Sequence, residues 1–200
     1  MSTATSPFSR KANNSEGGDY ELPPTGQQPA VLVGLIDLGT HSFTYQGKTT
    51  DAHKMAYVWE LVDPDERMKD GSPFVVLADF TISLAKKAKM RAMLEGWLGR
   101  SFGDDEAFDP LTLMGRNCVL NLTEGQTGTG KKFIEVASVA SPMKGYAIPP
   151  STLQQFVFML DNHHTALDEP PIPAWVPRLY GKTVSDEIKA SYEWGQLPQF

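Results

Sequence analysis

The segment Leu111–Val139 constrains the fold most strongly, because it has the pattern of two strands joined by a glycine-rich turn. Between residues 118 and 123, cysteine and leucine alternate with more polar neighbours, a period of two that is typical of a strand with one buried face. Glycines at 125, 128 and 130 then suit tight turns. The alternation resumes at Phe133 and continues to Val139. The segment therefore predicts a β-hairpin with a long connecting loop.

The tip of this hairpin carries Lys131 and Lys132, followed directly by Phe133. Two cations beside an aromatic ring suit a polyanion that also offers flat faces for stacking, such as an unpaired nucleic-acid strand. The tip is therefore our first candidate binding element.

The same loop resembles a nucleotide phosphate-binding loop, since Gly125 and Gly130 are followed by Lys131. The residue after that lysine is Lys132, where a phosphate-binding loop needs a serine or threonine hydroxyl for magnesium. The sequence then continues as a strand, whereas the motif requires a helix whose N-terminus receives the phosphates. No Ser-His-Asp arrangement or carboxylate pair stands in a recognisable frame elsewhere. We therefore expect no enzyme and no cofactor.

The order of the predicted elements indicates a mainly β protein. Three apolar strands precede a helix, and the hairpin follows it; they span residues 30–39, 53–62 and 73–82, with the helix at 84–98. Gly34, inside the first strand, favours a bulge or bend that lets a strand curve around a small barrel. Five strands with a helix between the third and fourth predict an OB-fold, a small and partly open barrel.

The flanks differ from this middle part in composition. Residues 1–29 are rich in serine, proline, glycine and asparagine, and we expect a disordered arm there. Residues 30–160 form the predicted OB-fold domain, in which the polar stretch 40–51 is a loop or short hairpin. Residues 161–200 form a tail with clustered prolines and a short helix near 184–194, which wraps the barrel or lies free.

Charge and composition further restrict the kind of protein that this chain can be. The net charge of −6 argues against a surface that is basic throughout, although the cations cluster in sequence. Cys118 is the single cysteine, so no internal disulfide and no cysteine-based zinc site are expected, and we expect it to be a small buried side chain. The adjacent pair His163 and His164 lacks the further ligands of a metal site. No apolar run is long enough for a membrane span, and no apolar leader is present, so we expect a cytoplasmic protein.

Other candidate binding residues lie outside the hairpin tip. Tyr57 and Trp59 share one face of the second strand, where they form either a base-stacking platform or part of the core. The cations chosen as phosphate contacts flank these rings, lie in the helix region or adjoin the hairpin: Lys54, Lys86, Lys87, Arg100, Arg116 and Lys144.

Three segments together carry a family resemblance: KKAKMRAMLEGWLGRSF, FDPLTLMGRNCVLNLTEGQTGTGKKFIEVASV and IPAWVPRLYGKTVSDEIKASYEW. As an ordered set they resemble phage-encoded single-stranded DNA-binding proteins of the OB-fold type. The resemblance implies sequence-tolerant binding of single-stranded DNA in phage replication or recombination, in the cytoplasm of the bacterial host. The contacts it implies fall on Tyr57, Trp59, Arg116, Lys131, Lys132 and Phe133.

The tail is a second candidate interface. Its acidic residues and the terminal Phe200 suit a docking peptide for replication or recombination proteins. Homodimerisation through a strand edge or the C-terminal helix is left open. The alternative to DNA binding is an OB-like protein-interaction module that serves as a replication or virion adaptor.

Overall fold

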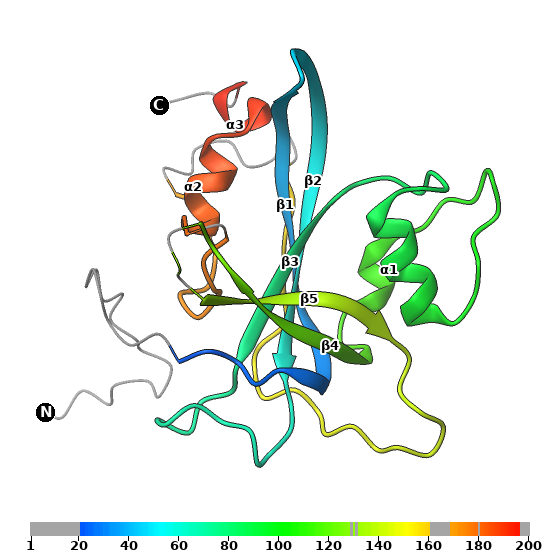
Figure 1. Ribbon diagram of the computed structural model, residues 1–200, viewed down its shortest axis with the longest axis vertical. Helices are drawn as coiled ribbons and strands as arrows, with labels where there is room; N and C mark the ends of the chain where they lie inside the picture. The colour runs from blue at the N-terminus through cyan, green and yellow to red at the C-terminus, as the bar shows by residue number, and fades with distance from the viewer. Residues whose placement is uncertain (1–20, 129, 131, 161–168, 180, 197–200) are drawn as a thin grey trace, which may run out of the picture.

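The computed structural model describes residues 21–196 apart from 129, 131, 161–168 and 180, and it is mainly β (Figure 1). The described part forms one six-stranded sheet with few helices. The strands are β1 (Gly26–Tyr45), β2 (Lys48–Leu61), β3 (Val75–Thr81), β4 (Asn117–Gln126), β5 (Lys132–Ala140) and β6 (Phe156–Phe158). The helices are α1 (Lys89–Leu98), α2 (Val184–Lys189) and α3 (Tyr192–Gln196), with a 3-10 turn at Pro110–Leu113.

The strand order is β3-β2-β1-β4-β5, and all of these neighbours are antiparallel. β1 is shared along its length: Gly26–Val31 pairs with β4, and Gly34–Ile36 pairs with β6 in parallel. β5 comes close to β3, yet no strand pairing joins them, so the sheet curls without closing.

The bend in β1 lies where its glycine predicted it. The register with β2 shifts between Leu32 and Gly34, and again between Asp37 and Gly39. A Cβ on Gly34 would lie 2.4 Å from the Phe156 ring, so only glycine lets β6 approach at this point.

Two boundaries near β1 differ from the sequence prediction. The strand begins at Gly26, four residues before the expected start at Ala30, because its first residues pair with β4. The stretch 40–51 adopts the hairpin of the two predicted alternatives, and it is longer than expected because it continues β1 and β2. Its turn has only two residues, Gln46 and Gly47, with φ of 50° and 76°, the backbone of a type I′ hairpin turn.

β1 and β2 bury side chains on both faces, so the protein has two apolar cores. The inner core lies on the α1 side and contains Met55, Tyr57, Trp59 and Leu61 of β2. The outer core lies on the opposite side and contains Ala56 and Val58. We call these sides the inner and outer faces of the sheet.

The helix α1 is shorter than predicted. It begins at Lys89 rather than at residue 84, and before it the Ser83 Oγ accepts a hydrogen bond from the Ala85 amide. Its apolar face is buried, since Met90, Leu94 and Trp97 lie in the inner core. The helix ends at Gly99, whose φ of 66° suits a left-handed C-cap.

The chain after β5 covers the outer face of β1 and β2. Figure 1 shows α2 and α3 beside β1, on the side away from α1. Leu153, Phe158, Ile188 and Trp194 all belong to the outer core, so residues 148–160 and the described part of 169–196 are packed rather than free. The predicted single helix at 184–194 is two short ones, and Thr183 and Asp186 form a capping box on the first.

None of the helices in the described ranges has the length and apolar character needed to cross a bilayer.

Candidate nucleic-acid interface

Trp97 holds together the elements that form the base of the β4–β5 hairpin. Its Nε1 donates a hydrogen bond of 2.9 Å to the Asn117 carbonyl at the start of β4. The Ser141 hydroxyl, one residue beyond β5, donates to the Trp97 carbonyl. These bonds fix the end of α1, the start of β4 and the end of β5 against one another, and we call this region the hairpin base.

Three of the predicted cations flank these anchors. Arg116 immediately precedes Asn117, Lys144 follows Ser141 by three residues, and Arg100 follows the helix cap Gly99. All three are exposed. Chain connectivity thus brings Arg100, Arg116 and Lys144 to the same end of the hairpin.

Arg100 is the most constrained of these cations. Its guanidinium pairs with Glu106 at 2.6 Å and lies over the Phe102 ring, 4.6 Å from the centroid. The hydrogen bond from Arg100 is the main cause that holds the pKa of Glu106 below its usual range. Arg116 and Lys144 form no ion pair within the described ranges, so they are the cations best placed to meet an anion.

Within the described ranges, no helix or strand covers the outer face of β4 and β5. Asn121 and Ser138 lie opposite each other on it, Thr123 is the next outward residue of β4, and all three are exposed. Near the tip the Phe133 ring packs over Gly125, where a Cβ would lie 2.5 Å from the ring. The ring remains 41% exposed, so it offers a flat and supported stacking surface.

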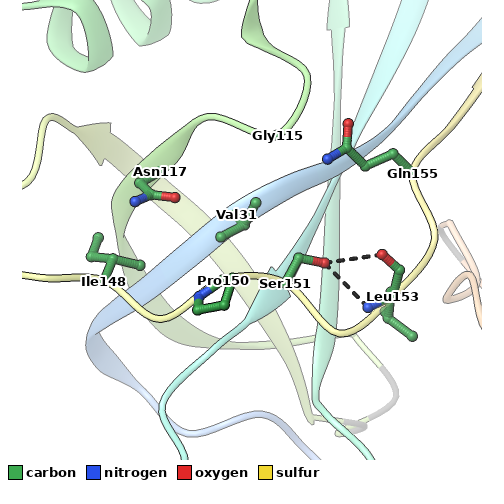
Figure 2. Close-up of a pocket in the computed structure, with 8 residues that line it drawn as sticks. All are labelled: Val31, Gly115, Asn117, Ile148, Pro150, Ser151, Leu153 and Gln155. Atoms are coloured by element: carbon green, nitrogen blue, oxygen red, sulfur yellow. Dashed lines mark hydrogen bonds between the residues drawn. The ribbon is translucent and has the colours of Figure 1, made fainter.

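A pocket of about 330 Å³ opens beside the hairpin base (Figure 2). One side comes from β1 and the start of β4, and the other from the crossover that follows β5. Its lining residues are Val31, Gly115, Asn117, Ile148, Pro150, Ser151, Leu153 and Gln155.

A buried carboxylate fixes the crossover that forms one wall of this pocket. Glu60 of β2 has no exposed surface, and its oxygens accept bonds from four donors of the turn 151–153. The hydroxyls of Ser151 and Thr152 lie at 2.6 Å, and the amides of Thr152 and Leu153 lie at 2.9 and 3.0 Å. A buried charge needs such partners, so the crossover has one defined position on the outer face.

Tyr57 and Trp59 do not belong to the interface. Both have no exposed surface, and their rings stack on each other at 5.8 Å between centroids, inside the inner core. The prediction of a stacking platform is therefore corrected: α1 covers this face of β2, and Trp97 packs against Trp59. Burial also raises the pKa of Tyr57, and neither Tyr57 Oη nor Trp59 Nε1 has a hydrogen-bond partner among the described residues.

Three predicted lysines are already engaged with carboxylates. Lys54 pairs with Asp79 at 2.8 Å and is mostly buried, which corrects its assignment as a free phosphate contact. Lys86 pairs with Asp104 at 3.1 Å and Lys132 with Glu124 at 2.9 Å, both on exposed surface. Such exposed pairs contribute little energy, so an incoming phosphate can replace them.

Two further predicted cations lie apart from this arrangement. Lys87 is exposed in the turn before α1, and nothing described connects it to the hairpin base. Lys131 lies outside the described residues.

Sequence reasoning missed the two side-chain amides of the pocket, Asn117 and Gln155, and the exposed ring of Tyr146. Tyr146 stands in a proline-rich stretch next to Lys144, an aromatic-basic pairing that was visible in the sequence. Asn117 and Gln155 had no such signal, because only the fold brings positions 117 and 155 together.

A second polar cluster joins the far part of the β1–β2 hairpin to α3. His53 Nε2 lies 2.6 Å from Asp37 Oδ1, and its Nδ1 lies 3.6 Å from Glu193 Oε1. Glu193 also accepts bonds from the Thr40 amide and hydroxyl at 2.6 and 2.5 Å. Burial opposes ionisation of Glu193, but the Thr40 bonds and His53 outweigh it and lower its pKa. The cluster therefore holds α3 against the β1–β2 hairpin.

Other groups with reactive potential are structural or fall outside the described residues. Cys118 is buried as predicted, and burial raises the pKa of its thiol. No group of three or more metal-ligating side chains occurs in the part of the chain that the structure describes. His163 and His164 lie outside it.

Comparison with known proteins adds no family: no protein-family model matches the sequence, and no curated protein matches it significantly.

Proposed function

We propose that this chain is an OB-fold protein that binds single-stranded DNA along the outer face of β4 and β5 and at the hairpin base. The strand order β3-β2-β1-β4-β5, with α1 between β3 and β4 and with β5 approaching β3, is compatible with a partly open barrel of this type. The resemblance of three segments to phage single-stranded DNA-binding proteins supports a role in phage DNA replication or recombination.

One observation carries the proposal. The exposed outer face of β4 and β5 carries a supported ring near its tip, and the exposed cations Arg116 and Lys144 flank the base of the same hairpin along the chain. Cations such as Arg116 and Lys144 suit the phosphates, and Phe133 and Tyr146 suit the bases. Proteins that bind single strands without strict sequence preference combine these two kinds of contact.

The test is the fluorescence anisotropy of a labelled oligo-dT at several salt concentrations, with unlabelled duplex of equal length as competitor. We expect tight binding that the duplex does not compete, and log affinity that falls with log salt by about 0.7 per neutralised phosphate. The double variant Arg116→Ala/Lys144→Ala should lose affinity and reduce this slope by about 1.4. Lys48→Ala is the matched control, since Lys48 lies at the turn of the β1–β2 hairpin, at the top of Figure 1 and away from the β4–β5 hairpin. Absence of binding at low salt contradicts the proposal.

The rival function is a protein-interaction module, and the ion pairs favour it. Carboxylates already neutralise Lys86, Arg100 and Lys132, and the net charge is −6. Under this alternative, oligo-dT fails to bind at low salt, and the uncovered face of β4 and β5 captures a protein instead. Trp194 is buried in the outer core, so it is not available to the docking peptide proposed at the C-terminus. The proposal then concerns only residues 197–200, which lie outside the described part.

A further inference from the structure

We propose that the pocket beside the hairpin base accepts one unpaired nucleobase, whose edge is read by the side-chain amides of Asn117 and Gln155. This inference rests on the proposed function, because the base belongs to a single strand held on the neighbouring surface. It goes further than that function in naming a position where binding depends on the base.

The size of the pocket suits such a ligand. Its volume of about 330 Å³ lies at the lower end of the range of about 300–1,000 Å³ for small-molecule sites. It is open on one side rather than enclosed, so a base still attached to its strand can enter it.

The lining has the mixed character that a nucleobase requires. Val31, Ile148 and Pro150 supply apolar contacts for the faces of a planar ring. Figure 2 shows the amides of Asn117 and Gln155 on opposite sides of Val31. Each amide offers both a donor and an acceptor, the combination that pairs with the edge of a base. Neither amide has a hydrogen-bond partner among the described residues, so both are available to a ligand.

The walls of the pocket are fixed before any ligand arrives. The turn 151–153 is held on Glu60 by the four donors described above. On the other side Gly115 has a left-handed backbone, with φ of 71°, and a Cβ there would lie 2.7 Å from Gln155 Nε2. The absence of a side chain at Gly115 therefore makes room for the Gln155 amide. A preformed site of this kind loses little entropy when it binds.

The pocket is also continuous with the surface proposed to hold the strand. Arg116 is the neighbour of Asn117 in the chain, and Tyr146 stands two residues before Ile148. A strand whose base occupies the pocket thus has a cation for its phosphate and a ring for an adjacent base close at hand.

The experiment compares Asn117→Ala and Gln155→Ala with the control Gln154→Ala. Gln154 is an exposed glutamine next to Gln155 that does not line the pocket. Anisotropy is measured with 15-residue dT, dA and dC oligonucleotides and with an abasic strand of equal length. We expect each pocket variant to lower the affinity for the preferred homopolymer by about tenfold and to leave the abasic strand unaffected. Gln154→Ala should match the parent protein on every strand.

Two results overturn the inference while the proposed function stands. One is unchanged affinity of both pocket variants for every homopolymer. The other is an equal loss on the abasic strand, which would show that the amides act on the backbone or on folding.

A second measurement separates the inference from the proposed function. The side-chain amide NMR signals of Asn117 and Gln155 are followed while each of the four deoxynucleoside monophosphates is added. Selective shifts of these two signals, with the Gln154 amide unmoved, support the pocket even if long oligonucleotides fail to bind. No shift with any of the four at millimolar concentration overturns it.

Discussion

One curled sheet has two outer regions that differ in what covers them. These regions are the outer face of β1 and β2 and the outer face of β4 and β5. The first is covered by the chain that follows β5, and it carries apolar residues such as Ala56 and Val58. The second is open, and it carries Asn121, Thr123 and Ser138. The outward residues of a strand are thus apolar where another part of the chain covers them and polar where they are open to solvent.

The environment of charged side chains also differs between the covered face and the open face. On the covered face Glu60 is fully buried, accepts hydrogen bonds from the turn 151–153 and lies 3.7 Å from the Arg67 guanidinium. On the open face Glu135, which lies opposite Thr123, is exposed to water. A buried charge is costly to leave unpaired, whereas an exposed one is not. The covered face is therefore fixed by its interactions, and the open face is free to exchange partners.

The largest expected effect comes from removing the buried carboxylate. Glu60→Ala leaves the donors of the turn 151–153 without an acceptor and removes the link between β2 and the crossover. We expect the free energy of unfolding to fall by about 3–5 kcal/mol in denaturant titration, as when one partner of a buried charged network is lost.

The matched control is Glu135→Ala, an exposed glutamate on the open face, which should change stability by less than about 0.5 kcal/mol. Equal effects of the two changes would mean that the covered and open faces do not differ as the structure indicates.

The next effect concerns Tyr57, which distinguishes a core ring from a stacking ring. Tyr57→Ala removes a ring packed against Trp59 and Phe80 and should cost about 3–5 kcal/mol of stability. Tyr57→Phe removes only a buried hydroxyl without a partner among the described residues, so it should leave stability equal or raise it by about 1 kcal/mol.

Oligo-dT affinity provides the second readout for the same residue. Tyr57→Phe should leave this affinity unchanged, because the hydroxyl that it removes is buried. A loss of affinity without a loss of stability would restore Tyr57 to the binding surface.

Much of the fold followed from alternation along the chain. The hairpin of β4 and β5 and the bend at Gly34 were both predicted from local patterns. The hairpin at 40–51 was predicted only as an alternative to a loop, because glutamine is an uncommon first residue for a turn that needs positive φ at both positions.

The candidate site was harder to predict, because exposure depends on what covers a face. The alternation at Tyr57 and Trp59 identified one face of β2 but not the helix that packs on it. Lys54 looked like a free cation until β3 placed Asp79 beside it. The pocket combines positions 31, 117 and 155, which no local pattern connects.

Acid is expected to have a smaller effect on stability, through the cluster of Glu193, Thr40 and His53 that joins α3 to β1 and β2. The folded state lowers the pKa of Glu193 below its ordinary value of 4.5, so ionised Glu193 stabilises the fold above that pH. This contribution is lost as pH falls through the lowered pKa. At pH 6 Glu193→Gln should reduce stability by about 1 kcal/mol, since a charged hydrogen bond to Thr40 is replaced by a neutral one.

Denaturant titrations between pH 6 and pH 3 provide the measurement. The difference between the parent protein and Glu193→Gln should shrink toward the acid end, because Glu193 itself becomes neutral there. Other carboxylates with lowered pKa, such as Glu95 and Asp186, titrate in both proteins and cancel in the difference. A difference that stays constant with pH would show that the charge of Glu193 does not hold α3.

The smallest effect is expected at the exposed ion pair between Glu124 and Lys132, near the hairpin tip. Glu124→Gln removes the partner of Lys132, and both side chains are exposed, so stability should change by less than about 0.5 kcal/mol. Oligo-dT affinity should rise by about two- to fivefold, because Lys132 no longer has to leave a carboxylate to meet a phosphate.

Glu135→Gln separates this effect from general charge, since it removes one negative charge from the same hairpin at a residue with no ion pair in the described ranges. A larger gain with Glu124→Gln than with Glu135→Gln shows that freeing Lys132 is the cause. Equal gains would mean that DNA senses only the total charge of the hairpin, and the hairpin tip would then lose its distinct role in binding.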